Sequence, residues 1–196
     1  MKEWSALYQE HRNMRSVSAE LSGSLRKRLV ALAERGHCAR TVQGRFTRRD
    51  RGGLRELYIQ SADGADEREP LTALPMLEDA RLTLLALVSR KADQVHQFTA
   101  MIEGTAPGGR PWAAAVHLED DRAPGEQDRK GSGACGHAAF HCHVGPTLDD
   151  EPKVRVPLPA VGPAGALDWL LSIVIPGWEP APWPTIVAAL SAGRSS

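Results

Sequence analysis

The chain has 196 residues, of which 42% are hydrophobic and 24% are charged, and these proportions are ordinary for one globular domain. A chain of this length buries a large core, so it needs neither disulfides nor a structural metal in order to fold. The 24 Lys and Arg residues balance the 24 Asp and Glu residues. This balance argues against a protein that binds nucleic acid with its whole surface.

Several features favour a protein of the bacterial cytoplasm with no membrane contact. The first residues lack the basic start and apolar stretch of a secretory signal. The longest apolar run, Leu167–Ile175, contains Asp168 and is far shorter than the ~20 residues that span a bilayer. Three cysteines, an odd number, favour reduced thiols. Abundant Ala, Arg, Gly and Pro are typical of a GC-rich bacterial genome.

Residues 1–36 are predicted to form an N-terminal helical segment. Its apolar stripe, at steps of three and four residues, is typical of one helix face and runs through Leu21, Leu25, Leu29 and Leu32. Gly36 stands where a helix end favours a residue with positive φ. Residues 37–196 are predicted to form an α+β domain that makes one continuous globular unit with this segment.

From residue 40 onward the pattern becomes that of strands. Two strands, at 40–47 and 54–59, are predicted around a turn formed by Arg51, Gly52 and Gly53. An acidic loop is expected at 61–70. Segment 76–88 fits either a helix or a buried strand, and the sequence leaves this choice open.

The second half of the chain is predicted to contain hairpin-linked strands followed by helices. Strands are expected at 95–103, 112–118, 136–144 and 154–158. Pro163 is suited to the first position of a helix, and Pro184 opens a last short one. The predicted fold class is therefore α+β, with a mostly antiparallel sheet of about five to six strands and with N-terminal and C-terminal helices packed on it.

The stretch 135–145 carries the most specific chemistry in the sequence. In a strand, alternate side chains share a face, so His137, His141 and His143 would point the same way and Cys142 would face the core. Imidazoles this close together can converge on one ion, because each metal–nitrogen bond is only about 2 Å long. Imidazole suits Zn, Cu, Fe and Ni, so the spacing leaves the identity of the metal open.

A complete metal site would need further ligands. Cys135 beside the strand, His117 on the neighbouring hairpin or the acids at 149–151 could supply them. The metal would then activate water, with Glu103 or Asp150 assisting, and the protein would be a hydrolase-like enzyme. The alternative is a polar stripe of histidines that holds no ligand, so no cofactor is assured.

Residues 139–145, Ala-Phe-His-Cys-His-Val-Gly, resemble the signature of the histidine-triad nucleotide hydrolases, in which three His residues stand at alternate strand positions. The matching positions are Ala139, His141 and His143, so alanine replaces the first histidine. The resemblance implies His141 as a nucleophile and a nucleoside phosphate as the substrate.

A basic segment between residues 26 and 55 makes the charge distribution uneven, with ten Lys and Arg residues against two acids. Guanidinium groups make bidentate contacts with phosphate, which predicts a site for nucleic acid or another anion at Arg45, Arg48, Arg49 and Arg51. The alternative is that these arginines pair with the protein's own acidic loops. Only Phe46 is available among them for base stacking, which does not favour nucleic acid.

Residues 176–184 combine four prolines with Trp178 and Trp183. The prolines favour an extended backbone, and each Trp buries roughly 150–250 Å² when it packs. The two side chains either fasten this segment to the protein's own core or form a surface on which a partner docks, since Trp is enriched at binding hot spots.

The leading interpretation is a non-catalytic accessory or binding protein that acts through contacts with another protein or a small anionic ligand. The first alternative is the metal-dependent enzyme built on the histidine strand. The second alternative is a nucleic-acid binder that uses the arginine hairpin. Another protein is the favoured partner, nucleic acid is less favoured, and no membrane contact is expected.

Overall fold

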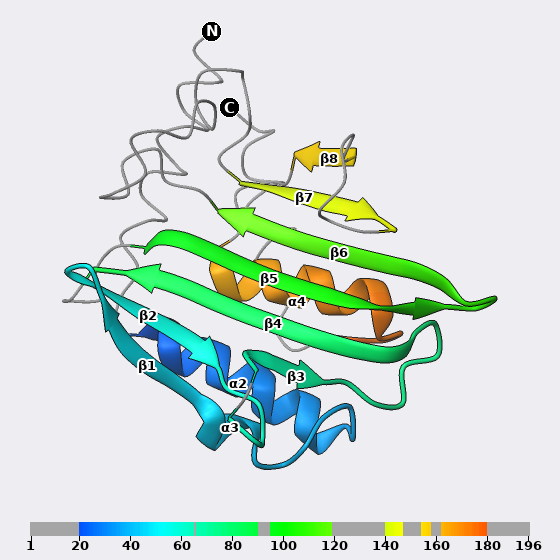
Figure 1. Ribbon diagram of the computed structural model, residues 1–196, viewed down its shortest axis with the longest axis horizontal. Coiled ribbons are helices and arrows are strands. Elements are labelled where there is room, and N and C mark those ends of the chain that lie inside the picture. The colour runs from blue at the N-terminus through cyan, green and yellow to red at the C-terminus, as the bar shows by residue number, and fades with distance from the viewer. Residues whose placement is uncertain are drawn as a thin grey trace, which may run out of the picture.

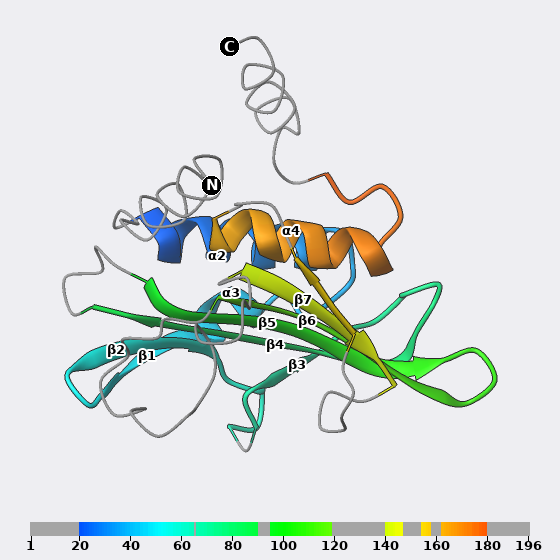
Figure 2. The ribbon, with the colours of Figure 1, turned by 90° about the horizontal axis from the view of Figure 1, so that it is seen from above.

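A computed structural model describes residues 20–64, 66–89, 95–118, 140–146, 154–157 and 162–179. In this part of the chain, two long helices pack on one face of an antiparallel sheet (Figure 1). Figure 2 shows helices α2 (Glu20–Glu34) and α4 (Pro163–Val174) together on the same side of the sheet. The predicted α+β class, an antiparallel sheet with an N-terminal and a C-terminal helix packed on it, is confirmed.

The sheet contains eight described strands, and seven of them follow the order β1-β2-β4-β5-β6-β7-β8. The short strand β3 pairs with β4 outside this path. The strands are β1 (Phe46–Arg51), β2 (Leu54–Ile59), β3 (Arg68–Pro70), β4 (Glu78–Val88), β5 (Val95–Ala106), β6 (Arg110–Leu118), β7 (Phe140–Gly145) and β8 (Val154–Pro157). The number exceeds the five to six expected, because β3 lies in the predicted acidic loop and β4 occupies the ambiguous segment.

Strand β4 resolves the choice between helix and strand at residues 76–88. Its buried residues alternate along the strand, from Ala80 through Leu84 to Val88. These three positions are four residues apart, so they fit a helical face as well as a strand face. Pairing with β2 on one side and β5 on the other side makes the segment a strand.

The predicted strand at 40–47 is wrong in its first half, where the chain forms the short helix α3 (Val42–Arg45) and β1 begins only at Phe46. Arg26 of α2 explains this local structure. Its guanidinium donates hydrogen bonds to the carbonyl oxygens of Gln43, at 2.9 Å, and Phe46, at 2.7 Å. A helical turn leaves such carbonyls without partners inside the helix, and Arg26 satisfies them from a distant part of the sequence.

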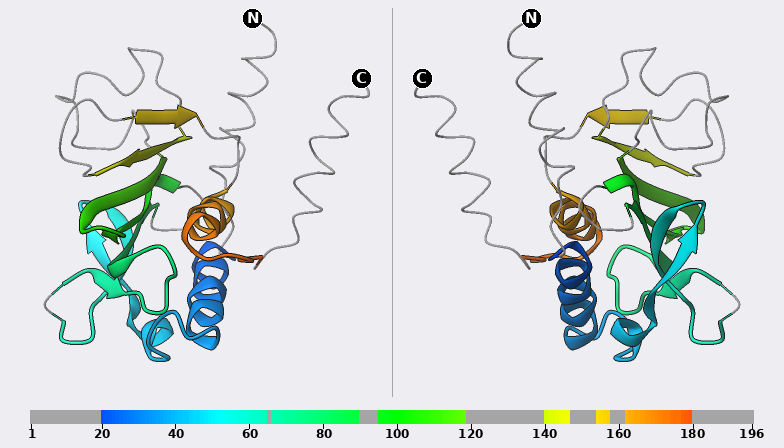
Figure 3. Two further views of the ribbon diagram at one scale, coloured as in Figure 1. Left: turned by 90° about the vertical axis from the view of Figure 1, so that its right-hand side faces the viewer. Right: turned by 90° about the vertical axis from the view of Figure 1, so that its left-hand side faces the viewer.

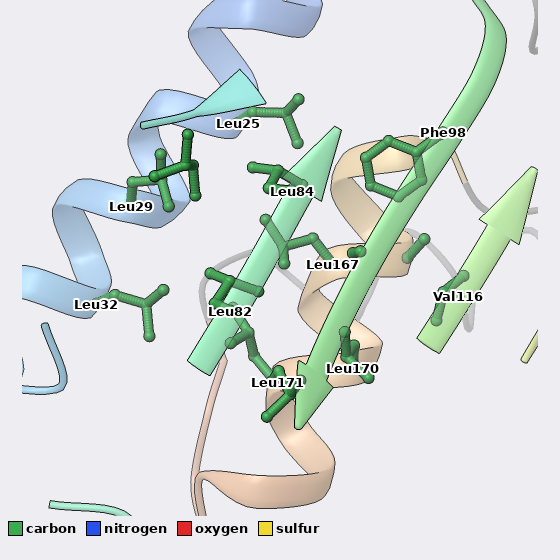
Figure 4. Packing of buried hydrophobic residues seen from close by; sticks show 14 of the residues in the cluster. Leu25, Leu29, Leu32, Leu82, Leu84, Phe98, Val116, Leu167, Leu170 and Leu171 are labelled. Atoms are coloured by element: carbon green, nitrogen blue, oxygen red, sulfur yellow. The ribbon is translucent and has the colours of Figure 1, made fainter. Parts of the chain in front are cut away.

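The core lies between the helices and the sheet (Figure 4). Three leucines of the predicted α2 stripe, Leu25, Leu29 and Leu32, are fully buried. Facing them are apolar side chains of α4, β4, β5 and β6, among them Leu167, Leu170, Leu171, Leu82, Leu84, Phe98 and Val116. Burial of one such side chain contributes roughly 1.5–3 kcal/mol.

Pro163 begins α4 as predicted. Residues 1–19 and the helix expected from Pro184 lie outside the described residues.

An ion pair joins the two helices. Figure 3 shows α2 and α4 side by side. Arg28 of α2 donates from Nε to both carboxylate oxygens of Asp168 in α4, at 3.1 Å each, and from Nη2 at 2.8 Å. Both side chains are mostly buried, at 14% and 12% exposed, so this bidentate pair is shielded from water. No described helix is long and apolar enough to cross a membrane.

Gly104 of β5 lies against an irregular part of β4. The register between the two strands shifts between Glu78 and Arg81, and Asp79 has a φ of 49°. A Cβ atom at position 104 would lie 2.9 Å from the carbonyl oxygen of Glu78 and 3.1 Å from the Cα of Ala80. Both neighbours are backbone atoms, so neither can rotate away from an added methyl group.

We expect Gly104→Ala to lower the free energy of unfolding by roughly 1–3 kcal/mol, because a strand backbone must shift. Gly23→Ala is the matched control, since a Cβ there meets nothing within 4 Å. Ala is the better helix former, so this control should gain up to about 1 kcal/mol. Urea unfolding followed by circular dichroism measures both changes, and a Gly104→Ala protein as stable as the parent would contradict the expectation.

Candidate functional site

The sheet face opposite the helices carries three histidines. Val116 and Cys142 are fully buried and belong to the core on the helix side. Because side chains alternate along a strand, His117 of β6 and both His141 and His143 of β7 face the other way. The prediction that Cys142 faces the core is confirmed. We call His117, His141 and His143 the histidine cluster.

The register between β6 and β7 brings these three imidazoles together. His117 and His141 are direct cross-strand partners, and their ring centres are 5.9 Å apart. His143 pairs with Ala115, whose small side chain leaves room for the His143 ring. That ring lies 5.1 Å from His117 and 4.7 Å from His141, measured between ring centres.

Strand β5 adds a polar contact to the histidine cluster. Thr99 is the cross-strand partner of His117, and its Oγ1 lies 3.2 Å from Nδ1 of that imidazole. Because this contact engages Nδ1, a ligand bound by His117 would meet Nε2. The cluster is also largely shielded from solvent, since His141 is 6% exposed and His143 is 7% exposed.

The rings as they stand do not form a metal site. Within the described ranges, no group of three or more His, Cys, Asp or Glu side chains is arranged to hold a metal ion. The ring planes of His117 and His143 meet at 82°, and those of His141 and His143 at 65°. These edge-to-face arrangements bring the rings together without directing three nitrogens at one point.

The structure places only part of the predicted metal ligand set. His141 and His143 lie together, while Cys135, His137 and the acids at 149–151 lie outside the described residues. The third member of the observed cluster is His117, which the sequence named only as an additional ligand. Glu103, considered as an assisting acid, accepts a hydrogen bond from Arg68 at 2.8 Å.

Three of the four predicted anion-binding arginines, Arg45, Arg49 and Arg51, contact the protein's own carboxylates near the β1 edge of the sheet. Glu56 of β2 is fully buried, and Arg51 donates to it at 2.8 Å while Arg49 donates to its second oxygen.

Three further contacts complete this arginine network. Arg49 also pairs with Glu67 and lies 4.4 Å from the ring centre of Tyr58. Arg45 donates to the buried Glu69 at 2.8 Å, whereas Arg48 is exposed. Intramolecular pairing, the alternative that the sequence left open, therefore describes three of the four arginines.

Trp178 lies in the protein's own core. It is 2% exposed, its Nε1 is 3.4 Å from Oδ1 of Asp168, and the guanidinium of Arg35 lies 4.8 Å from its ring centre. Trp178 thus fastens the segment after α4 to both helices, which was one of the two roles considered for it. Trp183, the second predicted docking residue, lies outside the described residues.

The two described cysteines are free and buried. Burial, reinforced by the nearby carboxylate of Glu69 and opposed by Arg45, raises the pKa of Cys38 to about 12. Burial alone raises the pKa of Cys142 to about 11. Neither thiol therefore has the lowered pKa of a reactive nucleophile.

No protein-family model, no curated protein and no solved structure matches this chain. The resemblance to the histidine-triad hydrolases is confined to residues 139–145, and Ala139 lies outside the described residues.

We expect Glu56→Gln to lower the free energy of unfolding by roughly 1–3 kcal/mol, because a buried amide would replace an acceptor of charge-assisted hydrogen bonds. Glu78→Gln, at an exposed position of β4, is the matched control and should stay within about 0.5 kcal/mol of the parent. Urea denaturation measures both variants. Equal losses would show that Glu56 stabilises the fold no more than a surface carboxylate does.

Iodoacetamide at pH ~8 should leave Cys38 and Cys142 unmodified in the folded protein, because the thiolate is the reactive form and is scarce at their raised pKa values. In concentrated urea both thiols should react. Peptide mass spectrometry distinguishes the two states, and rapid alkylation of either thiol in the folded protein would be inconsistent with this assignment.

Proposed function

We propose that the protein is a non-catalytic binding protein of the bacterial cytoplasm whose small ligand docks at the histidine cluster. The observation that carries this proposal is the meeting of three imidazoles from two adjacent strands on the sheet face opposite α2 and α4. Imidazole both donates and accepts hydrogen bonds and binds metals, so three of them side by side offer several contacts to one ligand.

The burial of the histidine cluster supports a small ligand over a protein partner. His141 and His143 are each less than a tenth exposed, which suits a ligand of few atoms. A stable protein interface instead buries about 800 Å² on each partner. In the described part of the chain, the exposed large hydrophobic residues are Met76, in a loop, and Ile173, on α4, which are on separate elements.

The two alternative functions, nucleic-acid binding and metal-dependent catalysis, make different demands on the structure. Phosphate would have to compete with the carboxylates that already bind Arg45, Arg49 and Arg51, so no contact described above favours nucleic acid. A metal-dependent enzyme would use the same sheet face as the small ligand, and its first requirement is that the histidine cluster binds a metal ion.

A cytoplasmic location is supported by the chemistry of the thiols. Cys38 and Cys142 are both free. A reducing compartment preserves such thiols, whereas disulfides are typical of proteins in oxidising compartments.

Thermal unfolding of the full chain in the presence of small anions, nucleotides and divalent cations tests the proposal. A ligand at ~100 times its Kd adds about 2.7 kcal/mol, which raises the Tm of a protein of this size by roughly 5–10 °C. We expect at least one of these probes to raise the Tm of the parent and to leave the His141→Gln/His143→Gln double variant unchanged.

His37→Gln is the control in this experiment, because His37 lies between α2 and α3, outside strands β5, β6 and β7, and contacts the carbonyl oxygen of Thr72. This variant should respond to the probe as the parent does. If no probe raises the Tm of the parent, or if the double variant responds equally, ligand binding at the cluster is refuted.

A further inference from the structure

We infer that a second copy of this chain docks on the outer edge of β1, and that the two β1 strands pair antiparallel. In this pairing Arg48 of each copy lies opposite Asp50 of the other copy. Strand β1 is the last in the sheet order, and β2 is its one described neighbour (Figure 1). Its other edge therefore carries backbone groups that no described strand pairs. This dimer is independent of ligand binding at the histidine cluster.

Two hydrogen bonds show which backbone groups of β1 point away from β2. The carbonyl oxygen of Arg45 accepts a hydrogen bond from the amide of Gln60, the residue after β2. The carbonyl oxygen of Phe46 instead accepts one from Arg26 of α2, which lies outside the sheet. Because these directions alternate along a strand, the amide and carbonyl groups of residues 48 and 50 also point outward.

The turn at the end of β1 leads to the same assignment. Gly52 and Gly53 have φ values of 56° and 88° and form a two-residue turn that pairs Arg51 with Leu54. In such a hairpin the two residues that flank the turn exchange backbone hydrogen bonds. The backbone of Arg51 therefore faces β2, and the backbone of Asp50 faces outward.

Arg48 and Asp50 are the charged side chains of β1 that the described contacts leave uncompensated. Both are exposed, and neither forms an ion pair with a described residue, whereas Arg49 and Arg51 bind Glu56. They stand two residues apart, so they lie on the same side of the sheet. An added strand with the opposite order of charges would compensate both, and an antiparallel copy of β1 has that order.

The charges of β1 select one register. An antiparallel copy can place Arg48 opposite Arg48, Asp50 opposite Asp50, or Arg48 opposite Asp50. Like charges directly opposite each other destabilise a strand pair, which excludes the first two registers. The third register puts the two-fold axis between the two copies of Arg49, whose charge is already balanced by Glu56 and Glu67.

The interface is small and polar. Each pair of Arg48 with Asp50 exchanges two backbone hydrogen bonds, and Arg26 already holds the next outward carbonyl, that of Phe46. Exposed ion pairs add little affinity and weaken in salt. Interfaces of this size are typical of weak, reversible complexes. We therefore expect a dimer in equilibrium with the monomer.

Sedimentation equilibrium of the full chain at low salt tests this inference. The average mass should rise from one chain at ~5 µM towards two chains at ~500 µM. Asp50→Arg and Arg48→Asp should each weaken the dimer by at least about tenfold, because like charges then face each other. The double variant Arg48→Asp/Asp50→Arg restores opposite charges and should associate within about threefold of the parent. Arg110→Asp, at the exposed start of β6, is the matched control and should leave the association unchanged.

Amide hydrogen exchange followed by NMR gives a second readout. The amides of Arg48 and Asp50 should exchange more slowly in the dimer than in the monomer, while that of Thr47, which faces β2, should not change. Circular dichroism confirms that each variant is folded. A parent that stays monomeric at ~500 µM, or a dimer that both single charge reversals leave equally stable, overturns the inference. If the monomer instead binds an oligo-glutamate peptide at this edge, the partner is a foreign strand and the two-copy pairing falls.

Discussion

The coverage of a single sheet face by two helices is the constraint on which the rest of the structure depends. The central strands alternate apolar and polar side chains, so α2 and α4 must lie on the apolar rows. The bidentate pair between Arg28 and Asp168 then holds the two helices at one spacing. The opposite face carries polar and charged side chains, with the arginine–carboxylate network around Glu56 at one end and the histidine cluster at the other. One face therefore forms the core, and the other gathers charged and polar side chains.

The fold was predictable from the sequence where a local pattern has only one structural solution. The leucine stripe of α2 and the proline at the start of α4 are such patterns, and both were predicted correctly. Residues 76–88 were not predictable, because Ala80, Leu84 and Val88 satisfy both the helical and the strand period. Only hydrogen bonds with β2 and β5 distinguish the two states, and those partners are remote in the sequence. Helix α3 depends in the same way on contacts from Arg26, 17 and 20 residues away.

The candidate site was predictable only where the pattern within one strand determines it. Alternation along one strand places His141 and His143 on a common face, but the contribution of His117 depends on the register between β6 and β7. The long connection between these strands gives no local rule for that register.

The arginine network was easier to predict from the sequence. A tight turn at Gly52 and Gly53 pairs Arg51 with Leu54, and the same register sets Arg49 opposite Glu56. Reading along this hairpin would have predicted the ion pair that now occupies the arginines.

The position of α4 also determines when the protein can fold during its synthesis. Arg28 and Asp168 are 140 residues apart, and the leucines of α4 complete the core that α2 begins. Until residues 163–174 have left the ribosome, the apolar rows of β5 and β6 have no helix to cover them. The nascent chain therefore exposes this hydrophobic sheet face from the synthesis of β6 until α4 is available, and a transiently exposed apolar surface favours aggregation. Contacts this distant in sequence also slow folding, because the long loop between α2 and α4 must close before they form.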